Sequence, residues 1–113
     1  MEDCLFCNIA AGKIPSDIVY EDDRILCFRD IHPQAPVHVL VIPRVHIASA
    51  ADITEENCEI VAHIFACIPK IVRMLGLTDG FRIISNCGTD ACQSVQHLHF
   101  HILGGRQLKD HMG

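Results

Sequence analysis

Three histidines late in the sequence occupy every second position, as His97, His99 and His101. Alternate side chains of a β-strand point to the same face, so the imidazoles would share one face and the apolar residues between them the other. Imidazole titrates close to neutral pH and can bind a metal, transfer a proton or act as a nucleophile. A lone histidine on a strand is usually solvated or hydrogen-bonded, but three at this spacing above an apolar face indicate a chemical site.

Two further features suit the same chemistry. His38 lies in a β-branched run over residues 37–42, and it would meet the histidine row if that strand neighbours the last one. A polar loop over residues 86–94 offers short side chains and backbone amides of the kind that bind phosphate, although ordinary turns use the same residue types. Clustered imidazoles disfavour one another's protonation, which leaves at least one of them neutral and nucleophilic.

Cys4 and Cys7 stand at a spacing that suits zinc, which takes four ligands in structural sites. The sequence contains no second Cys-x-x-Cys, so histidines would have to complete such a site. Free thiols are the alternative, and a thioredoxin-like redox role is disfavoured because no βαβ pattern surrounds the pair. Four other cysteines are interpreted as small fillers of core or surface: Cys27, Cys58, Cys67 and Cys87.

The elements that must position these residues follow from apolar periodicity and turn residues. Asp3 is expected to cap a short helix that Gly12 ends. Two strands, over residues 18–21 and 25–29, are expected to meet at an Asp-Asp turn. Together with the strand over residues 37–42 they predict an antiparallel meander.

A long amphipathic helix is expected from Thr54 to Leu75, because apolar residues recur there at spacings of three and four. Pro69 removes one backbone donor and is expected to kink or split this helix. Two more strands are expected over residues 81–86 and 95–103. The pattern predicts an α+β fold with an antiparallel sheet of about five strands, one long helix and one short helix. Residues 1–113 are expected to form a single domain.

Composition narrows the classes of function. The net charge is −5 and the nine basic residues are scattered, which argues against binding to polymeric nucleic acid or to an anionic membrane. The sequence has no apolar run of about 18 residues and no signal-peptide pattern, so we expect a soluble protein of the cytoplasm, or of the nucleus in a eukaryote. Seven cysteines without an export signal argue against a disulfide framework.

The histidine row also carries a family pattern. Residues 97–103 read His-φ-His-φ-His-φ-φ, where φ is apolar, and this pattern resembles the hallmark of the histidine-triad family. The similarity covers residues 4–107 and points to the Hint branch. Other stretches similar to that branch are residues 14–15, 20–24, 30–31, 33–36, 38, 41–43, 46–47, 75–77, 93–95 and 103–107.

This resemblance implies an α+β domain that forms a homodimer through its helix and edge strand, so that one continuous sheet results. It also implies a hydrolase that cleaves the P–N bond of purine nucleoside 5′-phosphoramidates through a nucleotidyl-histidine intermediate. The alternatives are a nucleotide-binding regulator without turnover, a relative that cleaves dinucleoside polyphosphates or caps, and a metal-storage module. The expected ligand is a purine nucleotide, and no cofactor or metal is expected to take part in the catalysis.

Residue by residue, the resemblance assigns the nucleophile to His99 and further catalytic roles to His101, His38 and Ser94. It implies further contacts around the α-phosphate from Asn86, Cys92 and Gln93, although the branch often has glycine at the position of Cys92. It places Asp30 and Ile31 at the ribose and base, with apolar walls from Ile14, Val19 and Phe28, for which a core position is an alternative. The face that carries His99 is expected to be solvated, so that replacing His99 would spare folding.

Some members of the family bind zinc through a cysteine pair and two histidines, and the matching residues here are Cys4, Cys7, His46 and His97. Other members lack both the cysteines and the metal. We therefore hypothesise a structural zinc at these residues, with free thiols as the alternative. Pro69 and residues 108–113 depart from the branch, so its substrate preference does not transfer directly to this chain.

Overall fold

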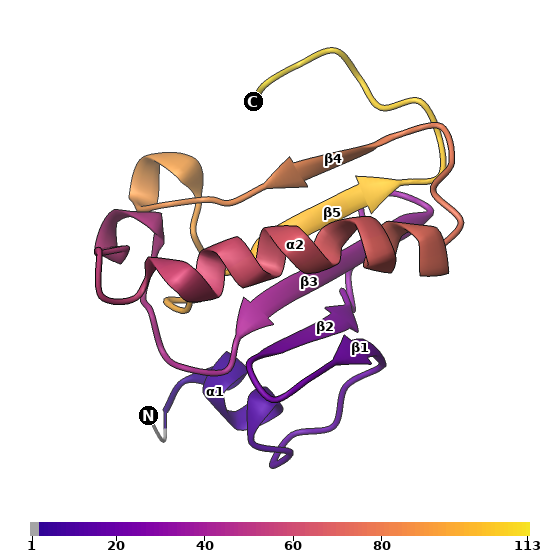
Figure 1. Ribbon diagram of the computed structural model, residues 1–113. Coiled ribbons are helices and arrows are strands. Elements are labelled where there is room, and N and C mark those ends of the chain that lie inside the picture. The colour runs from indigo at the N-terminus through magenta and orange to yellow at the C-terminus, as the bar shows by residue number, and fades with distance from the viewer. Residues whose placement is uncertain (1–2) are drawn as a thin grey trace.

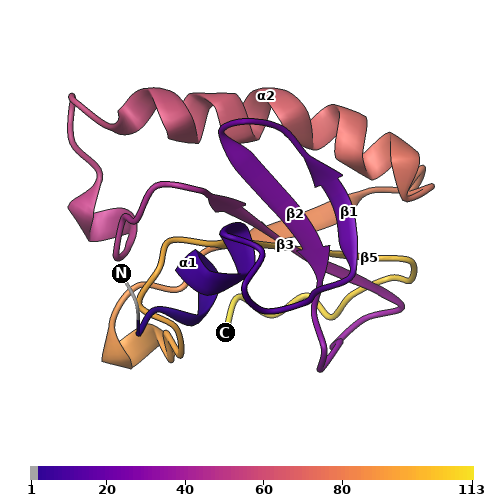
Figure 2. The same ribbon diagram turned by 90° about the horizontal axis from the view of Figure 1, so that it is seen from below.

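Five antiparallel strands form one sheet, and an α-helix packs on each of its faces (Figure 1, Figure 2). The computed structural model describes residues 3–113. The strands are β1 (Ile18–Glu21), β2 (Ile25–Arg29), β3 (Val37–Pro43), β4 (Phe81–Ile84) and β5 (Phe100–Gly104), in the spatial order β1-β2-β3-β5-β4. Helix α2 (Cys58–Met74) lies across one face and the short helix α1 (Leu5–Ala10) lies against the other. The predicted α+β fold is confirmed, although β4 ends before the expected residue 86.

Alternation along the strands separates two apolar clusters. Val39 and Val41 of β3 belong to the cluster beneath α2. Leu40 and Ile42 face the other way and pack with Phe6 of α1. The apolar residues that alternate with the histidines join the α2 cluster: Leu98, Phe100 and Ile102. The predicted apolar face of the row is therefore confirmed, and the imidazoles lie on the α1 side.

Strands β3 and β5 are neighbours, so His38 reaches the histidine row. The register places Leu40 opposite His101 and His38 opposite Leu103. His38 and Leu40 share one face of β3, which is also the face of β5 that carries His101. The predicted meeting of His38 with the row is confirmed.

The last strand is shorter than predicted. β5 begins at Phe100, so the expected strand over residues 95–103 was wrong in its first half. Residues 95–99 lie outside the regular pairing, which stops at Val41 opposite Phe100 although β3 itself continues to Pro43. They are held by isolated contacts instead, among them a 2.6 Å hydrogen bond from the Leu98 amide to the Ile47 carbonyl.

Cys4 caps helix α1 in place of Asp3, so the predicted cap was wrong by one position. The Cys4 Sγ accepts a hydrogen bond from the Cys7 amide at 3.4 Å, and this turn holds both cysteines near each other. Gly12 follows the helix with a φ of +77°, a left-handed conformation that ends helices readily.

Helix α2 begins at Cys58 and not at Thr54. Thr54 forms a turn instead, because its carbonyl accepts from the Cys58 amide at 2.9 Å and its amide donates to Asn57 Oδ1 at 2.7 Å. The helix runs through Pro69 to Met74, so the predicted split is not observed. Among residues 3–113, no helix has the length and apolar character to span a membrane.

Candidate active site

A cavity of about 520 Å³ opens on the α1 side of the sheet, beside the start of β5. Helix α1, the segments that flank β1 and β2, strand β3 and the histidine row all contribute to its walls. Seven of the predicted site residues line it: Ile14, Phe28, Asp30, Ile31, Ser94, His99 and His101. The fold thus brings distant parts of the sequence to one place.

His99 is fixed in a single orientation just before β5. Its Nδ1 lies 2.7 Å from the carbonyl oxygen of His97, which accepts only, so Nδ1 carries the proton and donates it. The hydrogen-bond network therefore assigns a free lone pair to His99 Nε2. The Phe6 ring packs edge-on against this imidazole, with 5.1 Å between centroids. His99 is 4% exposed, so the expectation of a solvated face was wrong.

A chain of hydrogen bonds sets the tautomers of the neighbouring histidines. The Gln34 amide donates to His38 Nδ1 at 3.0 Å, which makes His38 Nε2 the protonated nitrogen. That nitrogen donates to His101 Nδ1 at 2.9 Å and lies 3.4 Å from Asp30 Oδ2. His101 therefore carries its proton on Nε2, which remains to donate to a ligand. His99 and His101 offer a lone pair and a donor side by side, with 5.0 Å between their ring centroids.

Burial lowers the pKa values of His38 and His101 and so keeps these two imidazoles neutral at neutral pH. It lowers the pKa of His101 to about 4, supported by repulsion from His99 and His38 and opposed by the Asp30 carboxylate. Burial also lowers the pKa of His38, again against the attraction of Asp30. The neutral forms are those that the hydrogen-bond chain requires, because a doubly protonated His38 has no nitrogen left to accept the Gln34 amide.

The polar loop over residues 86–94 is closed by the side chain of Gln93. Its Oε1 accepts from the Gly88 amide at 3.0 Å, and its Nε2 donates to the carbonyls of Ala48 and Val95 at 2.8 and 3.1 Å. The side-chain amide of Gln93 therefore acts inside the loop and holds it in shape beside the cavity.

Cys92 adopts a left-handed conformation in this loop, with a φ of +60°. Glycine takes this conformation freely, whereas another residue loses about 1 kcal/mol, so the loop keeps a glycine-type backbone in spite of the side chain. The Cys92 amide donates to the Thr89 carbonyl at 3.1 Å. Of the predicted loop residues, Ser94 lines the cavity, whereas Asn86, Cys92 and Gln93 do not.

The predicted walls of the nucleotide site are divided between the two faces of the sheet. Ile14 and Phe28 line the cavity, and Ile31 lies at its rim with 86% of its surface exposed. Val19 instead packs with the cluster beneath α2, so the core alternative holds for this residue. The physical reason is a register irregularity between Ile18 and Tyr20, which interrupts the regular alternation of β1.

The site predicted from the sequence did not include the part of the cavity wall that α1 provides. Phe6 and Ile9 line the cavity, and Phe6 contacts the rings of both His97 and His99. Their spacing of three on a helix is the signal that could have found them. Leu40 was also missed, although its place on the same face of β3 as His38 indicated it.

Four potential metal ligands meet at the start of α1: Cys4, Cys7, His46 and His97, the predicted zinc set. Their ligand atoms lie within 4.8 Å of one another, with Cys7 Sγ 3.3 Å from His46 Nδ1 and Cys4 Sγ 3.4 Å from His97 Nδ1. His97 Nε2 lies 2.8 Å from the Pro43 carbonyl, so it carries the proton and leaves the Nδ1 lone pair for a metal. Two thiols and two imidazoles fit a tetrahedral zinc.

The fold and the site define a small α+β protein that presents paired imidazoles to a cavity of about 520 Å³. Residues 3–112 match the family model described as scavenger mRNA decapping enzyme C-term binding. A 14 kDa zinc-binding protein of Zea mays is 43% identical, with 92% of this chain and 83% of that protein covered. Adenylylsulfatase HINT1 of Arabidopsis thaliana is 42% identical, with 92% of this chain and 72% of that protein covered.

Solved structures show the same relationship. A histidine triad protein from Clostridium difficile has a TM-score of 0.95 and 50% identity, covering 98% of this chain and 97% of that one. A HIT family hydrolase from Legionella pneumophila Philadelphia 1 has a TM-score of 0.94 and 45% identity, and the match covers 98% of this chain and 100% of the Legionella chain. The chain belongs to the histidine-triad (HIT) family, and the predicted family is confirmed.

Proposed function

We propose that this chain hydrolyses purine nucleoside 5′-phosphoramidates with His99 as the nucleophile. The observation that carries the proposal is the pair of imidazoles at the cavity, in which His99 Nε2 has a lone pair and His101 Nε2 has a proton. A nucleophile next to a hydrogen-bond donor suits attack on phosphorus, because the donor stabilises the oxygen on which negative charge grows.

The proposed reaction consists of two displacements. In the first, a bond forms between His99 Nε2 and the α-phosphorus while the P–N bond breaks, and the amine leaves with an added proton. In the second, a P–O bond forms from water while the bond between phosphorus and His99 Nε2 breaks, so that the imidazole regains its lone pair and the proton lost by water restores the group that protonated the amine. Ser94 and His101 line the cavity and are the groups assigned to pass a proton to the leaving amine. All of these groups belong to the chain, so the proposal gives zinc no part in the chemistry.

The rest of the cavity suits a nucleoside. Ile14, Phe28 and Ile31 supply apolar surface for a flat base. Asp30 stands next to them, and its Oδ1 accepts from the His32 amide at 2.8 Å, which fixes the carboxylate toward the cavity. A carboxylate held in this way can accept hydrogen bonds from ribose hydroxyls.

A comparison of leaving groups tests this function. The Arabidopsis relative is named an adenylylsulfatase and the matching family model is named for decapping, so sulfate and nucleotide leaving groups are the relevant competitors. We expect kcat/KM for an adenosine 5′-phosphoramidate to exceed that for adenylyl sulfate and for a dinucleoside polyphosphate by about tenfold or more. Binding of AMP without turnover of any of the three substrates would support a regulatory protein instead.

We also propose that Cys4, Cys7, His46 and His97 bind a structural zinc ion. Their donor set and spacing support this assignment, and so does the relative from Zea mays that is named a zinc-binding protein. An ion held by these residues would join α1 to the segment that precedes β5, and so stabilise the wall that contains Phe6.

A homodimer is proposed at the open edge of the sheet. In the described part of the chain β4 pairs with β5 alone, so its other edge has no neighbour. Large apolar side chains are exposed on β4 and α2: Phe65, Met74, Phe81 and Ile84. An open strand edge beside apolar surface favours pairing with a second copy, which would continue the sheet.

Sedimentation of the wild-type protein at micromolar concentration is expected to give twice the mass of one chain. The substitution Ile84→Asp should give the mass of one chain, because a carboxylate on the edge strand would be buried without a partner. Val45→Asp is the matched control, since Val45 is also exposed but lies in the segment after β3. A wild-type monomer would contradict the proposed dimer.

A further inference from the structure

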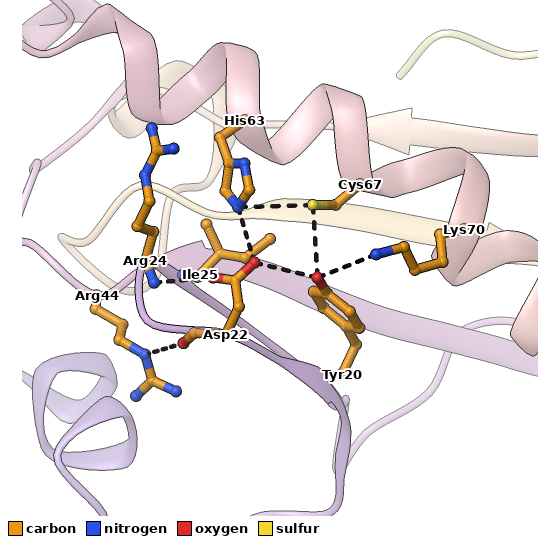
Figure 3. A network of polar contacts seen from close by, with 8 residues as sticks. All are labelled: Tyr20, Asp22, Arg24, Ile25, Arg44, His63, Cys67 and Lys70. Atoms are coloured by element: carbon orange, nitrogen blue, oxygen red, sulfur yellow. Dashed lines mark hydrogen bonds and ion pairs between the residues drawn. The ribbon is translucent and has the colours of Figure 1, made fainter.

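A second group of potential metal ligands lies on the α2 side of the sheet, on the opposite face from the catalytic cavity. Asp22 from the turn between β1 and β2 meets His63 and Cys67 of α2 (Figure 3). His63 Nε2 lies 2.8 Å from Asp22 Oδ2 and 3.7 Å from Cys67 Sγ. All three ligand atoms lie within 4.8 Å of one another. The sequence alone indicated that Cys67 is a small filler, and no step of the proposed reaction uses any of the three residues.

The backbone holds the carboxylate of Asp22 in place. Its Oδ1 accepts from the amides of Arg24 and Ile25 at 2.8 and 2.9 Å, and the Asp22 carbonyl accepts from Arg44 Nε at 2.8 Å (Figure 3). Oδ2 is left to face α2, where the Tyr20 hydroxyl donates to it at 3.1 Å. The carboxylate is therefore positioned before any ion arrives.

Helix geometry places the other two ligands. His63 and Cys67 are four residues apart on α2, so their side chains project from the same face one turn apart. Cys67 is buried, whereas the side chains of Asp22 and His63 remain 23% and 24% exposed. An ion can therefore enter from solvent, and water can fill a fourth position.

We propose that Asp22 Oδ2, His63 Nε2 and Cys67 Sγ form a second zinc site. Carboxylate, imidazole and thiolate are all zinc ligands, and bond lengths of about 2.0–2.3 Å put the ligand atoms of a tetrahedral ion roughly 3–4 Å apart. Binding shifts the proton of His63 from Nε2 to Nδ1 and releases the thiol proton of Cys67 to solvent. The Lys70 ammonium lies 3.4 Å from the Tyr20 hydroxyl and Arg44 Nε donates to the Asp22 carbonyl, so both cations are held by atoms other than the three ligand atoms.

The site contains its own spectroscopic reporter. Tyr20 is the single tyrosine of the chain, which has no tryptophan. Its hydroxyl lies 3.1 Å from Asp22 Oδ2 and 3.8 Å from Cys67 Sγ, so a paramagnetic ion at this site would be next to the fluorophore. Cobalt(II) is a suitable probe because it takes zinc's ligands, quenches nearby fluorescence and shows a sulfur-to-metal absorption band when a thiolate binds.

The test begins with zinc analysis of the full-length protein after equilibration with zinc and removal of the excess. Wild type should retain one more zinc ion per chain than Cys67→Val and His63→Gln. Cys58→Ser, which changes a different cysteine of α2, should match wild type. Because the measurement is a difference between variants, it does not depend on whether the Cys4 site is filled. Circular dichroism checks that each variant is folded. If the substitution at the buried Cys67 prevents folding, the comparison of wild type with His63→Gln still tests the site.

Titration of wild type and Cys58→Ser with cobalt(II) should quench the tyrosine emission. Both proteins should bind one more equivalent of cobalt(II) with a sulfur-to-metal band than Cys67→Val or His63→Gln, whatever the Cys4 site takes up. In the folded variants Cys67→Val and His63→Gln, cobalt(II) should not quench the tyrosine emission to saturation, and the additional equivalent of bound cobalt(II) should be missing. The proposal is overturned if these variants retain as much zinc as wild type, or if their tyrosine emission is quenched at the same cobalt(II) concentration. Either result would leave Asp22, His63 and Cys67 as a hydrogen-bonded contact between the turn and α2.

Discussion

The substitution His99→Asn is expected to lower kcat for an adenosine 5′-phosphoramidate by about 10³-fold or more, the scale seen when a covalent nucleophile is removed. An asparagine amide can still donate to the His97 carbonyl, so the segment before β5 should keep its conformation. Binding of AMP should remain within a few-fold of wild type, because the apolar walls and Asp30 are unchanged. Turnover and AMP affinity are measured separately, by steady-state kinetics and by calorimetry.

The covalent intermediate provides an independent check of this result. Rapidly quenched wild-type protein, kept away from acid, should carry an adenylate adduct that fragment mass spectrometry assigns to His99. The substitution His32→Ala is the control, because His32 is exposed and does not line the cavity. If His99→Asn retains comparable kcat, or the adduct lies on His97 or His101, then the nucleophile has been assigned to the wrong residue.

The double substitution Cys4→Ser/Cys7→Ser is expected to remove one zinc ion per chain and to lower Tm by about 10 °C or more. A structural zinc contributes several kcal/mol to folding, and each kcal/mol shifts the Tm of a domain of this size by roughly 3–6 °C. The loss arises because His46 and His97 would no longer be tied to α1. Elemental analysis and thermal unfolding measure the two effects.

The matched control for this experiment changes two exposed cysteines outside the metal group. Cys58→Ser/Cys92→Ser should keep the zinc and change Tm by no more than a few degrees, because neither thiol belongs to the proposed ligand set. Protein that contains no zinc, together with an unchanged Tm in Cys4→Ser/Cys7→Ser, would show that these residues are free thiols.

Local patterns predicted most of the elements. β1 and β2 have the expected bounds, because short runs rich in apolar and aromatic residues on either side of a turn are encoded by neighbouring residues. The start of β5 depends on where its pairing with β3 stops, at Val41 opposite Phe100, and that partner strand comes from a distant part of the chain. Val19 was misplaced for a similar reason, since the irregular pairing of β1 with β2 cannot be recognised from alternation within β1.

The candidate site was predictable where its residues form a motif. The histidine row and the Cys-x-x-Cys pair are visible in the sequence, and the resemblance supplied their distant partners. The group formed by Asp22, His63 and Cys67 has no such motif, because 41 positions separate Asp22 from His63. Its members are common residue types, and their meeting depends on how α2 lies across the sheet.

His97 links two kinds of site through one residue. Its side chain belongs to the proposed zinc group, while its carbonyl oxygen accepts the hydrogen bond that orients His99. Loss of the ion would therefore tilt the nucleophile without touching the substrate. A chelator added to this protein is therefore expected to lower its activity in an assay, although the proposed reaction assigns the metal no part in the chemistry, and adding zinc back should restore the activity.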